Sequence, residues 1–133
     1  MNDQPHAPEL LDAVRQFLEQ HLLPTVTDHR LRFQTLIAAH VLGIVSRELV
    51  TEEATLAAEQ TWLTDLLGAP QGEAASLAEQ RDLVRGLNER LCQRIRHGDF
   101  DDPTRWQEAT EIVRRMVVLK LEVANPRYLE ATR

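Results

Sequence analysis

The sequence has little cysteine, lysine, glycine or aromatic content. Its 133 residues include one cysteine, five glycines and six aromatic residues, and fourteen of its fifteen basic residues are arginine. A single cysteine, Cys92, cannot form an intramolecular disulfide or a multi-thiolate metal site, which excludes zinc-ribbon and ferredoxin classes and fits a reducing compartment. Because Leu91 and Ile95 are its neighbours on a predicted helix, we expect Cys92 to be packed as a small apolar group.

The usual catalytic motifs are also missing from the sequence. Its glycines are too dispersed for a phosphate-binding loop, and no histidine follows a glutamate at the Glu-x-x-His spacing of di-iron bundles. Neither a His-Glu-x-x-His zinc motif nor a Gly-x-Ser-x-Gly nucleophile elbow occurs. We therefore predict no catalytic residues, no metal site and no cofactor, and we expect that the protein is not an enzyme.

The charge distribution argues against nucleic-acid binding. The net charge is −6; residues 1–67 hold ten acidic and four basic residues, whereas residues 68–133 hold eleven of each. A phosphate backbone requires a sustained positive field, which neither half supplies.

The hydropathy pattern argues against export and against a membrane span. The first five residues are polar where a signal peptide would be basic and then apolar. The longest apolar stretch, residues 36–45, has about half the length that a bilayer requires. We expect a cytoplasmic protein.

Apolar residues recur every three or four positions and never alternate over a useful length, which predicts an all-α fold. We expect a single domain over residues 1–133, an up-and-down bundle of about five helices with short connections. The predicted starts and stops are Pro8 to Pro24, Asp28 to Leu49, Thr51 to Gly68, Ser76 to Gly98, and Asp102-Pro103 to Asn125-Pro126. The second and last helices are apolar around most of their circumference, so we expect both to be central and to pack together.

Two polar residues, His40 and Lys120, interrupt apolar helix faces and are candidate binding residues. His40 lies among Leu36, Ile37 and Ile44; it is either a hydrogen-bonded core imidazole, which we favour, or a group that titrates near neutral pH. Lys120 can meet an anionic ligand or a carboxylate such as Glu48, but a lysine whose head reaches water along apolar surface is the favoured interpretation.

The other candidates are amide, aromatic and guanidinium groups. Asn88 lies on the inner edge of the fourth predicted helix, where structural hydrogen bonding is favoured over ligand contact. Asn125, Arg127 and Tyr128 follow the last helix. This segment can act as a C-terminal clasp capped by Asn125, or as an interface anchor through Arg127 and Tyr128.

Several segments together resemble an uncharacterised bacterial family of small helical proteins, a domain of unknown function. The resemblance covers nearly the whole chain and is carried by Pro8-Glu9-Leu10-Leu11, Ile44-Val45-x-Arg47-Glu48-Leu49, Leu87-Asn88-x-x-Leu91-Cys92-x-x-Ile95-Arg96-x-Gly98, Leu119-Lys120-Leu121 and Asn125-Pro126-Arg127-Tyr128-Leu129. Members are typically encoded beside an aminoglycoside-phosphotransferase-like kinase and an acyl-CoA dehydrogenase, so the resemblance implies a part in acyl-CoA metabolism. Relatives more often carry Asn at the position of His40, which weakens a role for His40 as an essential base.

Three hypotheses of function follow. The first is a non-enzymatic accessory protein that binds the neighbouring kinase or dehydrogenase. The second is a small enzyme or acyl-CoA-binding module with a pocket between the central helices, where Lys120 and nearby arginines receive phosphates. The third is a homo-oligomer held through the hydrophobic last helix.

Overall fold

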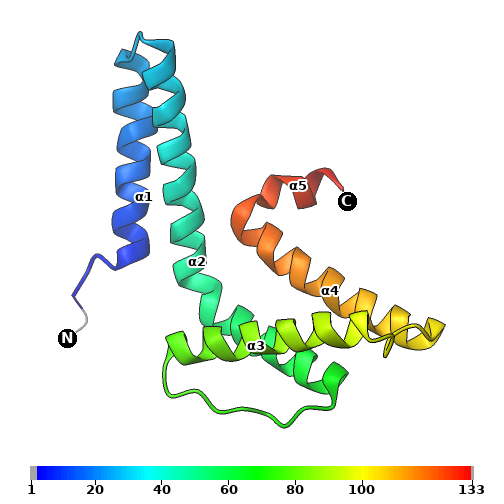
Figure 1. The fold of residues 1–133 in the computed structure, drawn as a ribbon. Helices are drawn as coiled ribbons and strands as arrows, with labels where there is room; N and C mark the ends of the chain where they lie inside the picture. Colours follow the sequence, from blue (N-terminus) through cyan, green and yellow to red (C-terminus); the bar gives the residue numbers. More distant parts are fainter. Residues whose placement is uncertain (1–2, 133) are drawn as a thin grey trace. The chain divides into compact units, whose positions relative to one another are not determined.

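The computed structural model describes residues 3–132, and its regular structure in this range is helical throughout. Five α-helices follow one another: α1 (Ala7–Phe17), α2 (His29–Leu67), α3 (Leu77–Arg96), α4 (Pro103–Ala124) and α5 (Pro126–Ala131) (Figure 1). A π-helical turn, Leu18–Leu22, and a 3-10 turn, Leu23–Thr25, extend α1. The prediction of an all-α protein with about five helices is confirmed.

The local signals that begin α3 and α4 and that end α2 act as the sequence predicts. Ser76 Oγ accepts a hydrogen bond from the Glu79 amide at 3.2 Å and caps α3. Asp102 caps α4 by accepting from the amides of Thr104 and Arg105 at 3.0 and 3.2 Å. Gly68 adopts φ of +62° directly after α2, a conformation that L side chains rarely adopt, and allows the Ala69 amide to donate to the Thr64 carbonyl at 3.0 Å.

The predicted helix boundary at Thr51 is wrong, because α2 runs without interruption through 39 residues. Thr51 does not cap a new helix; its hydroxyl donates to the Arg47 carbonyl at 3.0 Å, one turn back in the same helix. An N-cap must have extended backbone, and no glycine or proline near Thr51 forces the helix to stop. The short helix α5, which the sequence analysis missed, begins with Pro126 in its first turn, a position that suits proline.

Backbone contacts divide the chain into two compact units. Unit 1 comprises residues 1–51 with 123–125, and unit 2 comprises residues 52–122 with 126–133. Thr51 therefore lies at a unit boundary inside α2 rather than at a helix end. The single domain over residues 1–133 stays a prediction, because contacts within a unit do not measure cooperative unfolding.

Unit 1 is a helical hairpin in which α1 runs antiparallel to the first part of α2 (Figure 1). Three contacts fix this antiparallel arrangement. Ser46 Oγ donates to the Pro8 carbonyl at 3.4 Å, and Arg32 Nη1 donates to the Leu23 carbonyl at 2.9 Å. Between them, the Arg15 side chain lies against Gly43. The buried positions of α2 in this unit all have small side chains: Thr35, Ala39, Gly43 and Ser46. The two helices therefore approach along a stripe of small residues.

The prediction that the second helix is central is wrong for its apolar residues in unit 1. Phe33, Ile37 and Val41 are 64%, 48% and 48% exposed, because α1 covers the small-residue stripe and leaves the large side chains on the other faces of α2. His40 is also exposed, so the core-imidazole interpretation is wrong; it follows the buried Ala39 and is turned about 100° away from that face.

Unit 2 contains the hydrophobic core of the described residues. Leu63 and Phe100 are fully buried, and the predicted stripes of α3 and of the C-terminal part of α2 lie around them: Leu66, Leu67, Val84, Leu87 and Leu91, with Ala109 and Met116 from α4. The last predicted helix is thus less central than expected, since Val113, Val117 and Val118 of α4 are exposed. The predicted burial of Cys92 is also wrong, because Cys92 follows the buried Leu91 and is turned toward solvent.

The core can be tested with Leu63→Ala. Removing this fully buried side chain leaves a cavity and should lower the free energy of unfolding by about 2–5 kcal/mol. Leu77→Ala, at a 37% exposed position of α3, is the matched control and should cost about 1 kcal/mol or less. Urea denaturation followed by circular dichroism measures both values, and equal losses would contradict this placement of the core.

Candidate functional site

The polar residues of unit 2 gather around the C-terminal part of α2 and its neighbours α3 and α4. Four arrangements occur there: a buried carboxylate paired with Lys120, two arginines at the end of α2, a groove beside Trp62, and an ion pair between Glu52 and Arg81. Each is built by residues that helical spacing brings to one face, and each bears on what the protein can bind.

Glu59 and Lys120 form an ion pair between α2 and α4. The Lys120 ammonium donates to Glu59 Oε1 at 2.7 Å; the Glu59 side chain is 3% exposed, whereas that of Lys120 is 63% exposed. Most of the Lys120 side chain is thus exposed, and its head meets a carboxylate, which was the alternative interpretation. That carboxylate is Glu59 and not Glu48.

Glu59 was missed in the sequence analysis, although a signal for it was present. It lies between Leu56 and Leu63 at spacings of three and four residues, so it belongs to the inward face of α2. A carboxylate on such a face requires a cation or several hydrogen-bond donors. Since the cation that pairs with it, Lys120, comes from α4, sixty-one residues later, only the tertiary structure identifies the partner.

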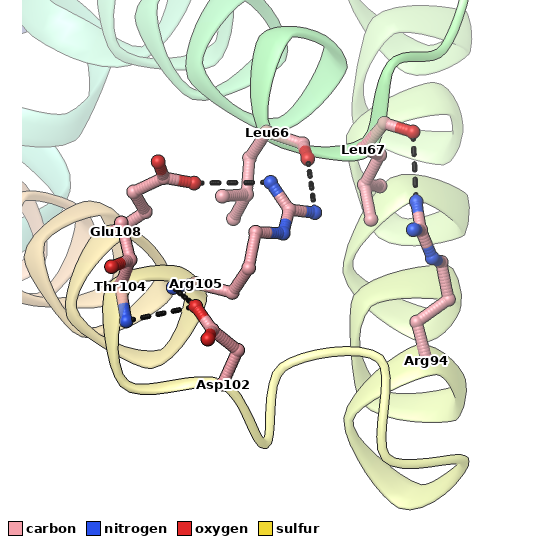
Figure 2. A network of polar contacts seen from close by, with 7 residues as sticks. All are labelled: Leu66, Leu67, Arg94, Asp102, Thr104, Arg105 and Glu108. Atoms are coloured by element: carbon pink, nitrogen blue, oxygen red, sulfur yellow. Dashed lines mark hydrogen bonds and ion pairs between the residues drawn. The ribbon is translucent and has the colours of Figure 1, made fainter.

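Two arginines bind the carboxyl end of α2 (Figure 2). Arg94 Nη1 of α3 donates to the Leu67 carbonyl at 2.8 Å, and Arg105 Nη2 of α4 donates to the Leu66 carbonyl at 3.4 Å. Both guanidinium groups lie over the buried ring of Phe100, 5.7 and 4.7 Å from its centroid. The last carbonyls of a helix carry partial negative charge, so these cations stabilise the end of α2 and its junctions with α3 and α4.

A groove of about 350 Å³ lies between α2 and α4. It is lined by one aromatic, two aliphatic and four charged residues: Trp62, Leu66, Ile112, Asp65, Glu108, Glu111 and Arg115. The Arg115 guanidinium lies 5.9 Å from the Trp62 ring centroid and pairs with Glu111 at 3.3 Å. With three carboxylates and one guanidinium, the groove suits cationic or neutral groups better than phosphates.

Glu52 and Arg81 join α2 to α3 through a forked ion pair. Arg81 Nε and Nη2 each donate to a different carboxylate oxygen of Glu52, the second bond at 2.7 Å. These hydrogen bonds hold the pKa of Glu52 below its ordinary value; desolvation opposes this effect, and charge attraction adds to it.

The six predicted binding residues do not form one site around this groove, since none of them lines it. His40 and Asn125 belong to unit 1, and the other four to unit 2. Asn88 Nδ2 donates to the Val84 carbonyl of its own helix at 3.1 Å, which is the structural role favoured for it. Asn125, Arg127 and Tyr128 are exposed.

No group of three histidine, cysteine, aspartate or glutamate side chains suited to a metal ion occurs among residues 3–132. The long helix α2 includes a window with a mean hydropathy of 1.3, of which 22% is buried. By length and composition alone it could cross a membrane, a property shared by core helices of soluble proteins.

Comparison with known proteins identifies a family for this chain. A family model described as Domain of unknown function (DUF6285) matches residues 24–128, which span α2, α3 and α4 completely. No curated protein and no solved structure matches the chain.

The Lys120–Glu59 pair can be tested with Lys120→Met. This change leaves a buried carboxylate without its cation and should lower the free energy of unfolding by about 1–3 kcal/mol. The double variant Glu59→Gln/Lys120→Met should recover most of the loss, because an amide is cheaper to bury than an unpaired carboxylate. Arg114→Met, at an exposed position of α4, is the control. Denaturant titration of the wild type and the three variants measures the free energies of unfolding. A double variant that is no more stable than Lys120→Met would contradict the pairing.

The Glu52–Arg81 pair predicts a pH dependence of stability. Because the folded-state pKa of Glu52 is depressed, its contribution is fully present above the unfolded value of about 4.5 and is lost as the pH falls through the folded pKa. The stability difference between the wild type and Glu52→Gln should therefore be constant at neutral pH and shrink below about pH 4.5. Urea titrations at pH 7, 5 and 3.5 measure it, with Glu53→Gln at the exposed neighbouring position as control. A difference that is unchanged at pH 3.5 would contradict the assignment.

Proposed function

Since this chain belongs to the family described as Domain of unknown function (DUF6285), we propose that it is a non-enzymatic accessory protein. Its partner in this proposal is an aminoglycoside-phosphotransferase-like kinase or an acyl-CoA dehydrogenase, the enzymes that the family resemblance places beside such proteins. Its role is to bind the enzyme through an exposed helix face of unit 2.

The observation that carries this proposal is an apolar stripe on the outer side of α4. Trp106, Val113 and Val117 are 56%, 41% and 47% exposed and follow one another at spacings of seven and four residues, so they share one face. A tryptophan exposed to this extent has a large apolar ring and an N–H donor available to a partner. Tryptophan is the residue type most enriched among interface hot spots.

The short helix α5 offers further contact groups of the same kind in unit 2. Tyr128 is 55% exposed and Arg127 is exposed. Tyrosine and arginine are enriched in protein interfaces, where a rigid ring or a planar fork contributes contact at low entropic cost. This supports the interpretation of the C-terminal segment as an interface anchor.

The charges in unit 2 support a protein partner over an acyl-CoA ligand. The groove beside Trp62 presents Asp65, Glu108 and Glu111, which repel the phosphates of a CoA thioester. Lys120, the cation proposed to receive them, is already neutralised by Glu59 at 2.7 Å. An acyl-CoA-binding module is therefore the weaker candidate.

The test is affinity purification of tagged protein from its native cells, followed by mass spectrometry. The wild type should retain the kinase or the dehydrogenase. The double variant Trp106→Ser/Val117→Asp should retain at least about tenfold less of that enzyme, because removing one central aromatic anchor costs about 2 kcal/mol or more of binding free energy.

Gln107→Ala, at an exposed position beside Trp106, is the matched control and should retain the enzyme at the wild-type level. Neither enzyme in the wild-type eluate would overturn the accessory role. Equal retention by the double variant would place the contact elsewhere on the protein.

A further inference from the structure

The groove beside Trp62 lies within unit 2 and combines an aromatic ring with apolar side chains and carboxylates. Leu66 is buried, while Trp62 and Ile112 are partly buried, so all three line the groove with apolar surface. Its volume of about 350 Å³ falls at the small end of the range for sites that hold small molecules, about 300–1,000 Å³. The groove therefore has the size of a site for a compact ligand.

The chain itself pairs two of the three carboxylates in this groove. Glu111 accepts a hydrogen bond from Arg115 Nε at 3.3 Å, and Glu108 accepts one from Arg105 Nη1 at 3.0 Å (Figure 2). Asp65 takes part in no ion pair and no side-chain hydrogen bond in the part of the chain that the structure describes. One negative charge of the groove is thus left without a cation.

The Trp62 ring already lies next to a positive charge. The Arg115 guanidinium is 5.9 Å from the ring centroid, within the distance of about 6 Å at which an aromatic face attracts a cation. Because Arg115 is paired with Glu111, it leaves the charge of Asp65 unbalanced. Asp65 follows Trp62 by three residues in α2, and side chains at this spacing are neighbours on a helix surface. The ring and the unpaired carboxylate are therefore placed to contact the same ligand.

We propose that the groove binds a small organic cation that has one positive charge and an apolar body, an amine of the arylalkyl type. Its ammonium group pairs with Asp65 and lies near the face of Trp62, and its body contacts Leu66 and Ile112. A carboxylate and an aromatic face both attract an ammonium group, and the partly buried ring strengthens this attraction by removing water. One charge is favoured over several, because the other two carboxylates of the groove are already paired.

This site is separate from the proposed partner-binding stripe of α4. Glu108 follows Trp106 by two residues, and Arg115 follows Val113 by two residues. Two residues correspond to a rotation of about 200° around an α-helix, so the groove and the stripe lie on opposite sides of α4. The inference goes beyond the accessory role, and the two can fail independently, because the ligand is tested with purified protein alone.

The test compares three compounds that share a phenethyl body and differ in the head group: phenethylammonium, neutral 2-phenylethanol and anionic 3-phenylpropanoate. Binding is followed by NMR through the indole N–H signal of Trp62 in a Trp106→Phe background, which has a single tryptophan. The amine should shift this signal saturably with a Kd of about 1 mM or less. The alcohol should bind at least about fivefold more weakly, and the anion should produce no saturable shift.

Two substitutions in the groove should change the affinity for phenethylammonium in opposite directions. Asp65→Asn removes the unpaired carboxylate and should weaken binding by about fivefold, whereas Arg115→Gln removes a like charge and should strengthen it by about twofold or more. Both positions are exposed, so the fold should tolerate these changes. Asp82→Asn is the matched control: it alters the charge equally at an exposed position of α3 outside the groove and should leave the Kd unchanged.

Four results would overturn the proposal. The first is the absence of a saturable shift with phenethylammonium up to about 10 mM, and the second is equal binding of the three compounds. The third is equal weakening by Asp65→Asn and Asp82→Asn, which would mean that the charge of the whole surface attracts the amine. The fourth is binding of Nα-acetylarginine amide at least about tenfold more tightly than the amine, which would assign the groove to a basic side chain of a protein partner.

Discussion

The carboxyl end of α2 is the point on which unit 2 depends. A helix of 39 residues ends there at Gly68, and its last carbonyl groups have no partners within the helix. Arg94 from α3 and Arg105 from α4 supply those partners, while Phe100, from the turn between α3 and α4, lies beneath both guanidinium groups. One cluster therefore satisfies a helix end and fixes two helix junctions. The abundance of arginine in the sequence is used structurally here, since the planar group donates to a carbonyl and contacts a ring at once.

Burial differs sharply between the two units, and this difference guides the functional interpretation. Unit 2 buries leucine, phenylalanine and methionine in one cluster and keeps a stripe exposed on α4. Unit 1 buries only small residues of α2 and exposes most of its large ones. Exposed apolar side chains therefore occur on both units.

Sequence reasoning succeeded where the signal was local. Ser76, Asp102 and Gly68 each act within one turn of the backbone, so residue type alone identified the start of α3, the start of α4 and the end of α2. It failed at Thr51, where a residue suited to capping occurs inside a continuous helix. A threonine at such a position is compatible with a helix start and with a continuous helix. Its hydroxyl can accept a hydrogen bond from a free amide or donate one to a carbonyl one turn back.

The sequence by itself determined the all-α class, the main helix ends and the apolar faces, since these follow from helical periodicity and from the backbone preferences of single residues. Only the tertiary structure decided which apolar faces are buried, which carboxylate meets Lys120 and where His40 and Cys92 lie. Those outcomes depend on how closely helices approach. In unit 1 the close approach occurs along Ala39 and Gly43, so small residues are buried and large ones remain outside. Hydrophobicity marks a residue as able to be buried, and packing geometry selects which residues are.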